Sequence, residues 1–572
     1  MTDIRRTVLW VVFTMSLILL WDGWQKHNGQ PSMFGPPVAA PVAESGAAPG
    51  MVGANTPTPT AVPGAAAVPS NAPTAVVGEK LTISTDVFKV TLDTLGGDVV
   101  RVELPKYLST HETEVFESLK RMVGLGSRST FEPVPIVLFD AVHAYKAQSG
   151  LVGSKGEQLP THNTLLTVVP GERTLQDGQN ELIVRMESPE VGGVKLIKTF
   201  SFKRGDYVIG VKHEIINVGT VPVTPQVYVQ LVRDGTPGPG GSSFYSTFTG
   251  PAIYNDKGKF HKIDFSDIDK NKVDLEKTAT DGWVAMVQHY FTSAWINNTP
   301  ASRDFFAKPV AGAVPNQYAV GMVFTLPSLA PGATESTQDQ LFVGPQEENK
   351  LAALSPGLQL VKDYGVFRVL SQPLFWLLDN LHQILGNWGW SIIALVVLLK
   401  IAFYWLNASA YKSMAKMKLV GPKVQALRER LKDKPQEMQK EMMRIYKEEK
   451  VNPIGGCLPI LLQMPFFIAL YWVLLSSVEM RGAPWLGWIV DLSARDPYFI
   501  LPILMTVSSL FQVWLNPTPP DPMQAKLMWM MPLAFSVMFF VFPAGLVLYW
   551  LTNNILSIAQ QWMINKQLGV QG

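Results

Sequence analysis

The sequence contains a single cysteine and a small share of charged residues. One cysteine in 572 residues excludes an intramolecular disulfide framework and a thiolate metal cluster. Charged residues make up 16% of the chain, whereas a typical soluble domain has about 25%. The net charge of +2 does not favour a nucleic-acid binder, so we expect no direct sequence-specific nucleic-acid binding. Hydrophobic residues make up 47%, which indicates that lipid is one of the solvents of this chain.

The motifs of common enzyme classes are also missing. The eight histidines are scattered without an HExxH motif or another metal-ligand spacing. The chain contains no P-loop, no GxGxxG and no GxSxG motif. We therefore expect no catalytic residue, no metal site, no cofactor and no enzyme activity.

The first residues have the pattern of a signal sequence. The pair Arg5-Arg6 precedes an uncharged apolar run, Thr7–Trp21. A cleaved signal peptide would have small residues directly after this run, but the segment Trp21–Trp24 contains two Trp and one Asp. We therefore predict an uncleaved signal anchor over residues 1–24. Residues 25–78 are rich in Pro, Ala, Gly and Thr without helical or strand periodicity, which predicts a flexible tether.

Residues 79–345 have the pattern of β-strands. Short runs with period-two alternation are separated by Gly, Pro and Asn, and the clearest of them are Ile83–Leu92, Val99–Leu104, Glu181–Met186, Val194–Phe202, Tyr207–Ile215 and Gln226–Leu231. This spacing is typical of an antiparallel β-sandwich. A segment of this length buries a full core without disulfides. We therefore predict one large antiparallel β-sandwich domain.

The remainder of the chain is predicted to be helical. Residues 346–386 form a linker and an amphipathic helix, Tyr364–Leu385, which Pro373 interrupts. We expect this helix at the membrane interface, because charged residues recur within it. Long apolar runs then predict five membrane spans, two of them in the last run, which is broken at Phe542–Gly545; the runs are Trp388–Leu406, Ile454–Ser477, Tyr498–Leu515 and Leu527–Ile564.

With the anchor, the prediction is a polytopic α-helical membrane protein with six spans. Residues 387–566 form its five-helix core, and residues 567–572 are a short C-terminal tail. Residues 409–450 contain twelve Lys or Arg and six Asp or Glu, whereas residues 22–360 contain 27 and 33. Basic residues in short loops stay in the cytoplasm. We therefore predict both termini in the cytoplasm and the β-domain on the opposite side of the membrane.

The cytoplasmic segment 409–450 has the pattern of a helical hairpin. Apolar residues recur at intervals of three and four on both sides of a turn at Lys434-Pro435, and Gly421-Pro422 marks the start. The basic residues either only enforce the topology or form a docking surface for an RNA-rich or acidic partner. For the second possibility the candidate residues are Lys412, Lys416, Lys423, Arg428, Arg430 and Arg444.

Lys400 is the one charged side chain within the five predicted C-terminal spans. A Lys at mid-bilayer costs roughly 2.5–3.5 kcal/mol on insertion scales, so it should face a wet cavity or a partner. Alternatively, its long stem reaches the lipid headgroups. Other polar residues lie at span depth, among them Gln463, Gln512 and Asn553. They either form hydrogen bonds between helices or line a hydrophilic groove with Lys400.

Residues 386–564 contain seven ordered motifs: Gly386–Ile392, Ser413–Met417, Val451–Cys457, Gln463–Pro465, Asp496–Tyr498, Asp521–Gln524 and Pro543–Trp550. In this order they resemble the YidC/Oxa/Alb family of membrane-protein insertases, in particular its Gram-negative YidC branch. The resemblance implies a five-helix insertase core around a hydrophilic groove that is open to the cytoplasm and to lipid. It also implies that the periplasmic domain is a β-super-sandwich related to sugar mutarotases, with nothing that requires it to be catalytic.

The resemblance suggests roles for individual residues. The family usually has Arg at the position of Lys400, so this chain keeps the positive charge and loses the forked guanidinium. A groove Thr of the family matches Val396. We expect the groove to be lined by Lys400, Gln463, Gln512, Tyr549, Trp550 and Asn553. We expect a lipid-facing slide for the substrate, formed by Phe466, Phe467, Met530 and Phe535.

The implied function is an inner-membrane insertase and chaperone, which inserts and helps fold newly made membrane proteins, alone or with the Sec translocon. The expected partners are nascent membrane proteins, membrane lipids, the Sec translocon, and ribosome and signal-recognition components at the cytoplasmic loops. One alternative is a secondary transporter of a small solute, which would have inverted repeats around a midplane ion site. Another is an anchored periplasmic carbohydrate-binding protein or mutarotase, which leaves the five C-terminal spans unexplained.

Overall fold

The computed structural model describes residues 77–109, 133–154, 156–236, 247–310, 315–365, 367–431, 434–449, 458–516 and 522–567. The predicted anchor, nearly all of the predicted tether, most of the predicted tail, and the motif Val451–Cys457 lie outside these residues. The chain divides into two compact units, of which the first ends at Asp363 and the second begins at Tyr364.

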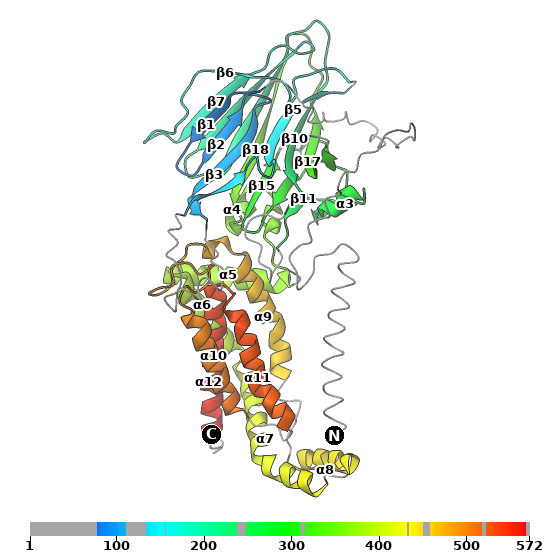
Figure 1. The fold of residues 1–572 in the computed structure, drawn as a ribbon. Helices are drawn as coiled ribbons and strands as arrows, with labels where there is room; N and C mark the ends of the chain where they lie inside the picture. The colour runs from blue at the N-terminus through cyan, green and yellow to red at the C-terminus, as the bar shows by residue number, and fades with distance from the viewer. Residues whose placement is uncertain are drawn as a thin grey trace, which may run out of the picture. The chain divides into compact units, whose positions relative to one another are not determined.

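The first unit contains two antiparallel sheets, each with nine strands among the described residues (Figure 1). In spatial order, the first sheet consists of β1 (Lys80–Ser84), β2 (Lys89–Asp93), β3 (Asp98–Leu108), β5 (Lys146–Gly153), β10 (Pro225–Asp234), β17 (Gln317–Thr325), β16 (Arg303–Val310) and β13 (Thr278–Ala279), with β4 (Pro135–Phe139) paired to β3. The second sheet consists of β12 (Lys259–Lys262), β11 (Gly250–Asn255), β14 (Trp283–Val287), β15 (Phe291–Ile296), β18 (Thr334–Pro345), β9 (Val208–Asn217), β8 (Val194–Lys203), β7 (Glu181–Glu187) and β6 (Thr167–Val168).

The two sheets pack face to face, as the alternating sequence predicts. In β7, buried and exposed residues alternate, so that one face of the strand points to the core. In the central strand β10, every residue is buried. The fully buried Trp295 of β15 crosses the interface, and its indole N–H donates to the carbonyl of Gln230 in β10 at 3.1 Å. The antiparallel sandwich predicted for this region is therefore confirmed.

Two boundaries in this unit differ from the prediction. The run Ile83–Leu92 is two strands, because the Thr85 hydroxyl accepts the N–H groups of Val87 and Phe88 and closes a turn between β1 and β2. Residues 346–363, predicted as a linker, belong to the first unit. They form α4 (Glu348–Leu354) and a 3₁₀ helix (Leu358–Val361), in which Leu351, Leu358 and Val361 are fully buried. One further short helix in this unit is α3 (Phe265–Asp269).

The second unit is helical. Its elements are α5 (Arg368–Leu385), α6 (Trp388–Ala402), α7 (Tyr404–Arg430), α8 (Pro435–Glu448), α9 (Leu458–Ser476), a 3₁₀ helix (Val478–Met480), α10 (Ile500–Leu515), α11 (Pro522–Phe539) and α12 (Ala544–Gln567). Figure 1 shows α6 and α9–α12 side by side, with α5 across one end and α7–α8 extending from the other. A single apolar core joins α5, α6, α9, α10 and α12. The last predicted run is indeed two helices, α11 and α12.

Pro373 and Pro422 do not act as the sequence predicts. Pro373 lies inside α5, where one missing backbone donor leaves the helix intact, and it does not interrupt the amphipathic pattern. Pro422 lies inside α7, so Gly421-Pro422 does not mark the start of the hairpin. Helix α7 begins at Tyr404, and the packing of α7 against α8 around Val420 and Val424 keeps α7 continuous.

The predicted span Trp388–Leu406 is broken. It ends as α6 at Ala402, and the chain continues as α7 after a bend of 69° at Phe403. Within the described residues, no single helix has both the length and the apolar character to cross a membrane, whereas the bent pair α6–α7 meets these criteria jointly.

Candidate functional site

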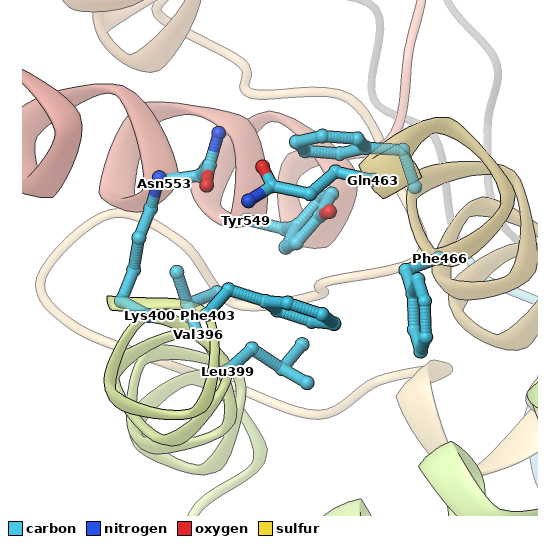
Figure 2. Close-up of a pocket in the computed structure, with 9 residues that line it drawn as sticks. Val396, Leu399, Lys400, Phe403, Gln463, Phe466, Tyr549 and Asn553 are labelled. Atoms are coloured by element: carbon cyan, nitrogen blue, oxygen red, sulfur yellow. The ribbon is translucent and has the colours of Figure 1, made fainter. Parts of the chain in front are cut away.

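A cavity that is open on one side lies beside the bend between α6 and α7, and its empty space, open solvent included, is about 320 Å³. Helices α6, α9 and α12 contribute most of its walls (Figure 2). It is lined by Val396, Leu399, Lys400, Phe403, Gln463, Phe466, Phe467, Tyr549 and Asn553. Four residues predicted for the groove, Lys400, Gln463, Tyr549 and Asn553, are therefore brought together around one cavity, although Lys400 and Asn553 are 153 positions apart in the sequence.

Lys400 lies at the C-terminal end of α6, where its side chain reaches α12. Its Nζ donates to the hydroxyl of Ser557 at 2.7 Å, and that hydroxyl donates to the carbonyl of Asn553 at 2.7 Å. Among the described residues, no carboxylate forms an ion pair with Lys400. The ammonium group therefore faces a cavity, and its hydrogen-bond partner among the described residues is a neutral hydroxyl. Ser557 was not predicted as a site residue.

Gln463 of α9 is oriented by a residue that the sequence does not single out. Its Nε2 donates to Oδ1 of Asn407 in α7 at 2.7 Å. Close by, the rings of Phe403 and Phe466 meet edge to face, with centroids 5.0 Å apart. Asn407 follows Lys400 by seven positions, which is two helical turns, but it is separated from it by the bend. Spacing alone is therefore no guide to its role.

Two predicted groove residues lie elsewhere. Gln512 of α10 is not among the residues that line the cavity. Trp550 packs its ring edge to face on Phe539 and Phe542, at centroid distances of 5.1 and 5.3 Å. Successive residues of a helix point about 100° apart, and here Tyr549 points to the cavity while Trp550 points to Phe539 and Phe542.

The predicted slide residues also divide into two groups. Phe466 and Phe467 line the cavity itself. Met530 and Phe535 lie on α11 with exposed fractions of 65% and 54%. They belong to a larger exposed apolar surface of α11, which also includes Trp529, Met531, Leu533 and Val537.

Several other polar residues of the predicted spans form hydrogen bonds between helices. The amide of Asn554 donates to Ser508 of α10 at 2.8 Å. Gln560 donates to the carbonyl of Tyr404 at 3.3 Å, and Gln561 donates to Asn516 at 2.9 Å. For these residues the interhelical interpretation fits, and they do not belong to the cavity.

The predicted cytoplasmic hairpin is formed by α7 and α8, with its turn at Lys434-Pro435. Val420 and Val424 pack against Met417, Met442, Ile445 and Tyr446. Two of the basic residues form ion pairs within the hairpin, Lys423 with Glu449 and Arg444 with Glu448. The exposed residues Lys412, Lys416 and Arg430 have no recorded ion pair among the described residues, while Arg428 is half-buried.

The β-sandwich contains a buried polar network between its sheets. The ammonium of Lys198, fully buried in β8, donates to the carbonyls of Gly96 and Ser149 at 2.6 and 2.7 Å, and to the Ser149 hydroxyl at 2.8 Å. That hydroxyl is 2.9 Å from Nε2 of His213, whose Nδ1 lies 3.2 Å from Asp339. Burial lowers the pKa of Lys198 to about 8 and also lowers the pKa of His213.

A second part of the network surrounds Asp98. Gln148 donates to its carboxylate at 2.6 Å, and burial raises the Asp98 pKa to about 6 against the opposing charges of Lys146 and Lys198. His162 lies 2.6 Å from the Tyr228 hydroxyl, and its pKa is lowered to about 3, mainly by burial. No cluster of three or more potential metal ligands occurs among the residues that the structure describes. Within this network, Asp98 Oδ1 and His162 Nε2 are buried without a hydrogen-bond partner among the described residues.

Comparison with known proteins assigns the chain to a family. The family model described as "60Kd inner membrane protein" matches residues 380–570, and the model "YidC periplasmic domain" matches residues 127–377. A membrane protein insertase YidC from Cupriavidus necator is 53% identical over 99% of this chain and 98% of its own length. Another, from Burkholderia cenocepacia, is 50% identical over 99% of both chains.

The chain belongs to the YidC family of membrane protein insertases. It is therefore an inner-membrane protein with a periplasmic domain, and its family is not an enzyme class. A solved structure of an active YidC insertase is similar at 17% identity, with a TM-score of 0.38 over 84% of this chain and 94% of that one. A galactose mutarotase related enzyme from Lactobacillus acidophilus is similar over 46% of this chain and 97% of its own, at 11% identity and a TM-score of 0.29.

Proposed function

We propose that this YidC-family protein inserts newly made membrane proteins and assists their folding, and that the cavity beside Lys400 receives the polar segment of the substrate. The observation that carries the proposal is the position of Lys400. Its ammonium faces a cavity between α6, α9 and α12 and has a neutral hydroxyl as its recorded partner. A cation without a counter-ion in a partly apolar site attracts acidic residues of a passing polypeptide.

The mixed lining of the cavity suits a polypeptide segment in transit. Polar groups of Lys400, Gln463 and Asn553 share it with the rings of Phe403 and Phe466. A polar tail that enters the cavity avoids a full crossing of about 30 Å of hydrocarbon. The apolar segment of the substrate then follows the exposed surface of α11, near Met530 and Phe535, into lipid. Hydrophobic transfer and the membrane potential supply the driving force.

The arrangement in the membrane is part of the proposal. We infer six spans, with the N-terminal anchor and five core spans, and with both termini in the cytoplasm. The charge difference between residues 409–450 and 22–360 supports this orientation. The bent pair α6–α7 supplies one of these spans and leads directly into the basic hairpin.

We further propose that the hairpin contacts ribosome and signal-recognition components, and that the core works alone or beside the Sec translocon. Exposed Lys412, Lys416 and Arg430 support the first interaction, because they are basic residues on α7 without a recorded acidic partner among the described residues. Lys423 and Arg444 contribute less to such a surface, since acidic neighbours already pair with them.

The test compares variants of Lys400 in a reconstituted insertion assay. Substrates with an acidic or a neutralised N-terminal tail are supplied to proteoliposomes. We expect Lys400→Ala to lower insertion of the acidic-tailed substrate about tenfold, which corresponds to about 1.4 kcal/mol, and Lys400→Arg to retain it. Lys566→Ala is the matched control, because Lys566 lies at the exposed end of α12, away from the cavity. Equal insertion by the Ala and Arg variants would contradict a role for the charge.

A further inference from the structure

Asn407 and Gln463 form a carboxamide pair beside the cavity. Gln463 Nε2 donates to Asn407 Oδ1 at 2.7 Å, which links α9 to α7. Asn407 is only 5% exposed, and its Nδ2 has no hydrogen-bond partner among the described residues. Buried donors are normally paired, because an unmade hydrogen bond is costly. Asn407 itself is not among the residues that line the cavity, but its partner Gln463 is, so the unpaired donor lies one residue behind the cavity wall and points to a ligand that supplies an acceptor.

The bend at Phe403 positions the pair. It redirects the chain so that Asn407 meets α9, and the Phe403 ring packs on Phe466 beside it. The carbonyl of Tyr404, in the first turn after the bend, accepts a hydrogen bond from Gln560 of α12. The pair thus lies just after the bend, where α9 and α12 both contact the chain. Gln463 itself lines the cavity.

The chemistry of the pair matches a polypeptide backbone. A carboxamide carries the same N–H donor and C=O acceptor as a peptide group. A peptide carbonyl can accept from Asn407 Nδ2, and a carboxamide–carboxamide bond can be exchanged for a carboxamide–peptide bond without a net loss of hydrogen bonds. Neither exchange depends on the side chain of the substrate residue.

We propose that Asn407 and Gln463 are a docking point for the backbone of the polypeptide in the cavity, so that they recognise the group common to all substrates. Lys400 then adds a preference for acidic residues. The proposal rests on the proposed function, because it assumes that a polypeptide enters this cavity. It makes Asn407 a substrate-contacting residue and Gln463 its partner.

The experiment measures insertion by the full-length protein in proteoliposomes, with the acidic-tailed and neutral-tailed substrates. We expect Asn407→Leu to lower insertion of both substrates by the same factor, about fivefold, and Asn407→Gln to restore most of it. Asn554→Leu is the matched control, because it also removes a buried interhelical asparagine bond, to Ser508, away from the cavity. We expect the Asn554→Leu protein to insert both substrates at the unsubstituted level when insertion is expressed per folded molecule.

A second readout tests contact itself. A photo-reactive phenylalanine analogue at position 403 should cross-link a stalled nascent chain, and Asn407→Leu should lower the yield severalfold. Normal insertion and cross-linking by Asn407→Leu, a loss confined to the acidic tail, or an equal loss in Asn554→Leu would each overturn the proposal. If Lys400→Ala has no effect while Asn407→Leu impairs both substrates, only the charge role fails. If the protein that carries the analogue at position 403 and is otherwise unchanged cross-links no nascent chain, the proposed function of the cavity fails with it.

Discussion

Lys198 provides a quantitative test of the buried network in the periplasmic domain. Its ammonium is fully buried and donates three hydrogen bonds, to two carbonyls and one hydroxyl. Lys198→Met keeps the length of the stem but leaves these acceptors, and the nearby carboxyl of Asp98, without the cation. Removal of one partner from a buried charged network costs about 3–5 kcal/mol. We therefore expect Lys198→Met to lower the free energy of opening of β8 and β9 by about 3–5 kcal/mol. Amide hydrogen exchange in the detergent-solubilised full-length protein measures this free energy.

The same strand contains a matched control. Lys195 lies three residues earlier in β8, on the surface, where it pairs with Glu187 at 2.7 Å. An exposed ion pair contributes about 0.2–1 kcal/mol, so Lys195→Met should change the opening free energy by no more than this. If Lys198→Met destabilises β8 no more than Lys195→Met does, the network is not a stabilising feature of the sandwich, and the reasoning from burial is refuted.

Two further predictions concern other parts of the protein. Burial lowers the pKa of His162 to about 3, so the folded state binds fewer protons than the unfolded state between about pH 3 and 6.5. From this group alone, the free energy of unfolding should fall on acidification through this window by about 1.4 kcal/mol per pH unit. His162→Asn should reduce the measured dependence of that free energy on pH by this amount. An unchanged pH dependence would contradict a lowered pKa of His162. Val424→Asp should open the hairpin, because an unpaired carboxylate replaces a buried side chain that packs in the α7–α8 contact. Hydrogen exchange should then show lost protection in α8 with α10 and α12 unchanged, and retained protection in α8 would argue against that core.

The parts of the fold that follow from the sequence are those with a local cause. Period-two runs predict strands such as β7 and β9, because one face of each lies against the core. The bend at Phe403 has no such cause, since neither Gly nor Pro stands there and the apolar run continues to Leu406. It depends on tertiary contacts, namely the Phe466 ring and the Gln560 side chain.

The candidate site shows the same division. Lys400 can be predicted because a lone charge in an apolar run is costly, whatever surrounds it. Ser557 and Asn407 cannot, because a Ser and an Asn in helices are common and acquire a role only through the partner that the fold brings near. The buried role of Lys198 cannot be predicted from the sequence for a similar reason. Its partner Ser149 lies 49 positions away, and a Lys in a strand suggests a solvent-facing residue.

The central claim is that a polypeptide in transit occupies the cavity beside Lys400. A photo-reactive lysine analogue at position 400 preserves the ammonium and reports direct contact with ribosome-bound membrane-protein chains stalled at successive lengths. We predict cross-links that appear while the polar tail of the substrate is being translocated and disappear once its apolar segment has entered the lipid. Cross-links that are absent at every chain length, while the same protein inserts the released substrate normally, would contradict the account.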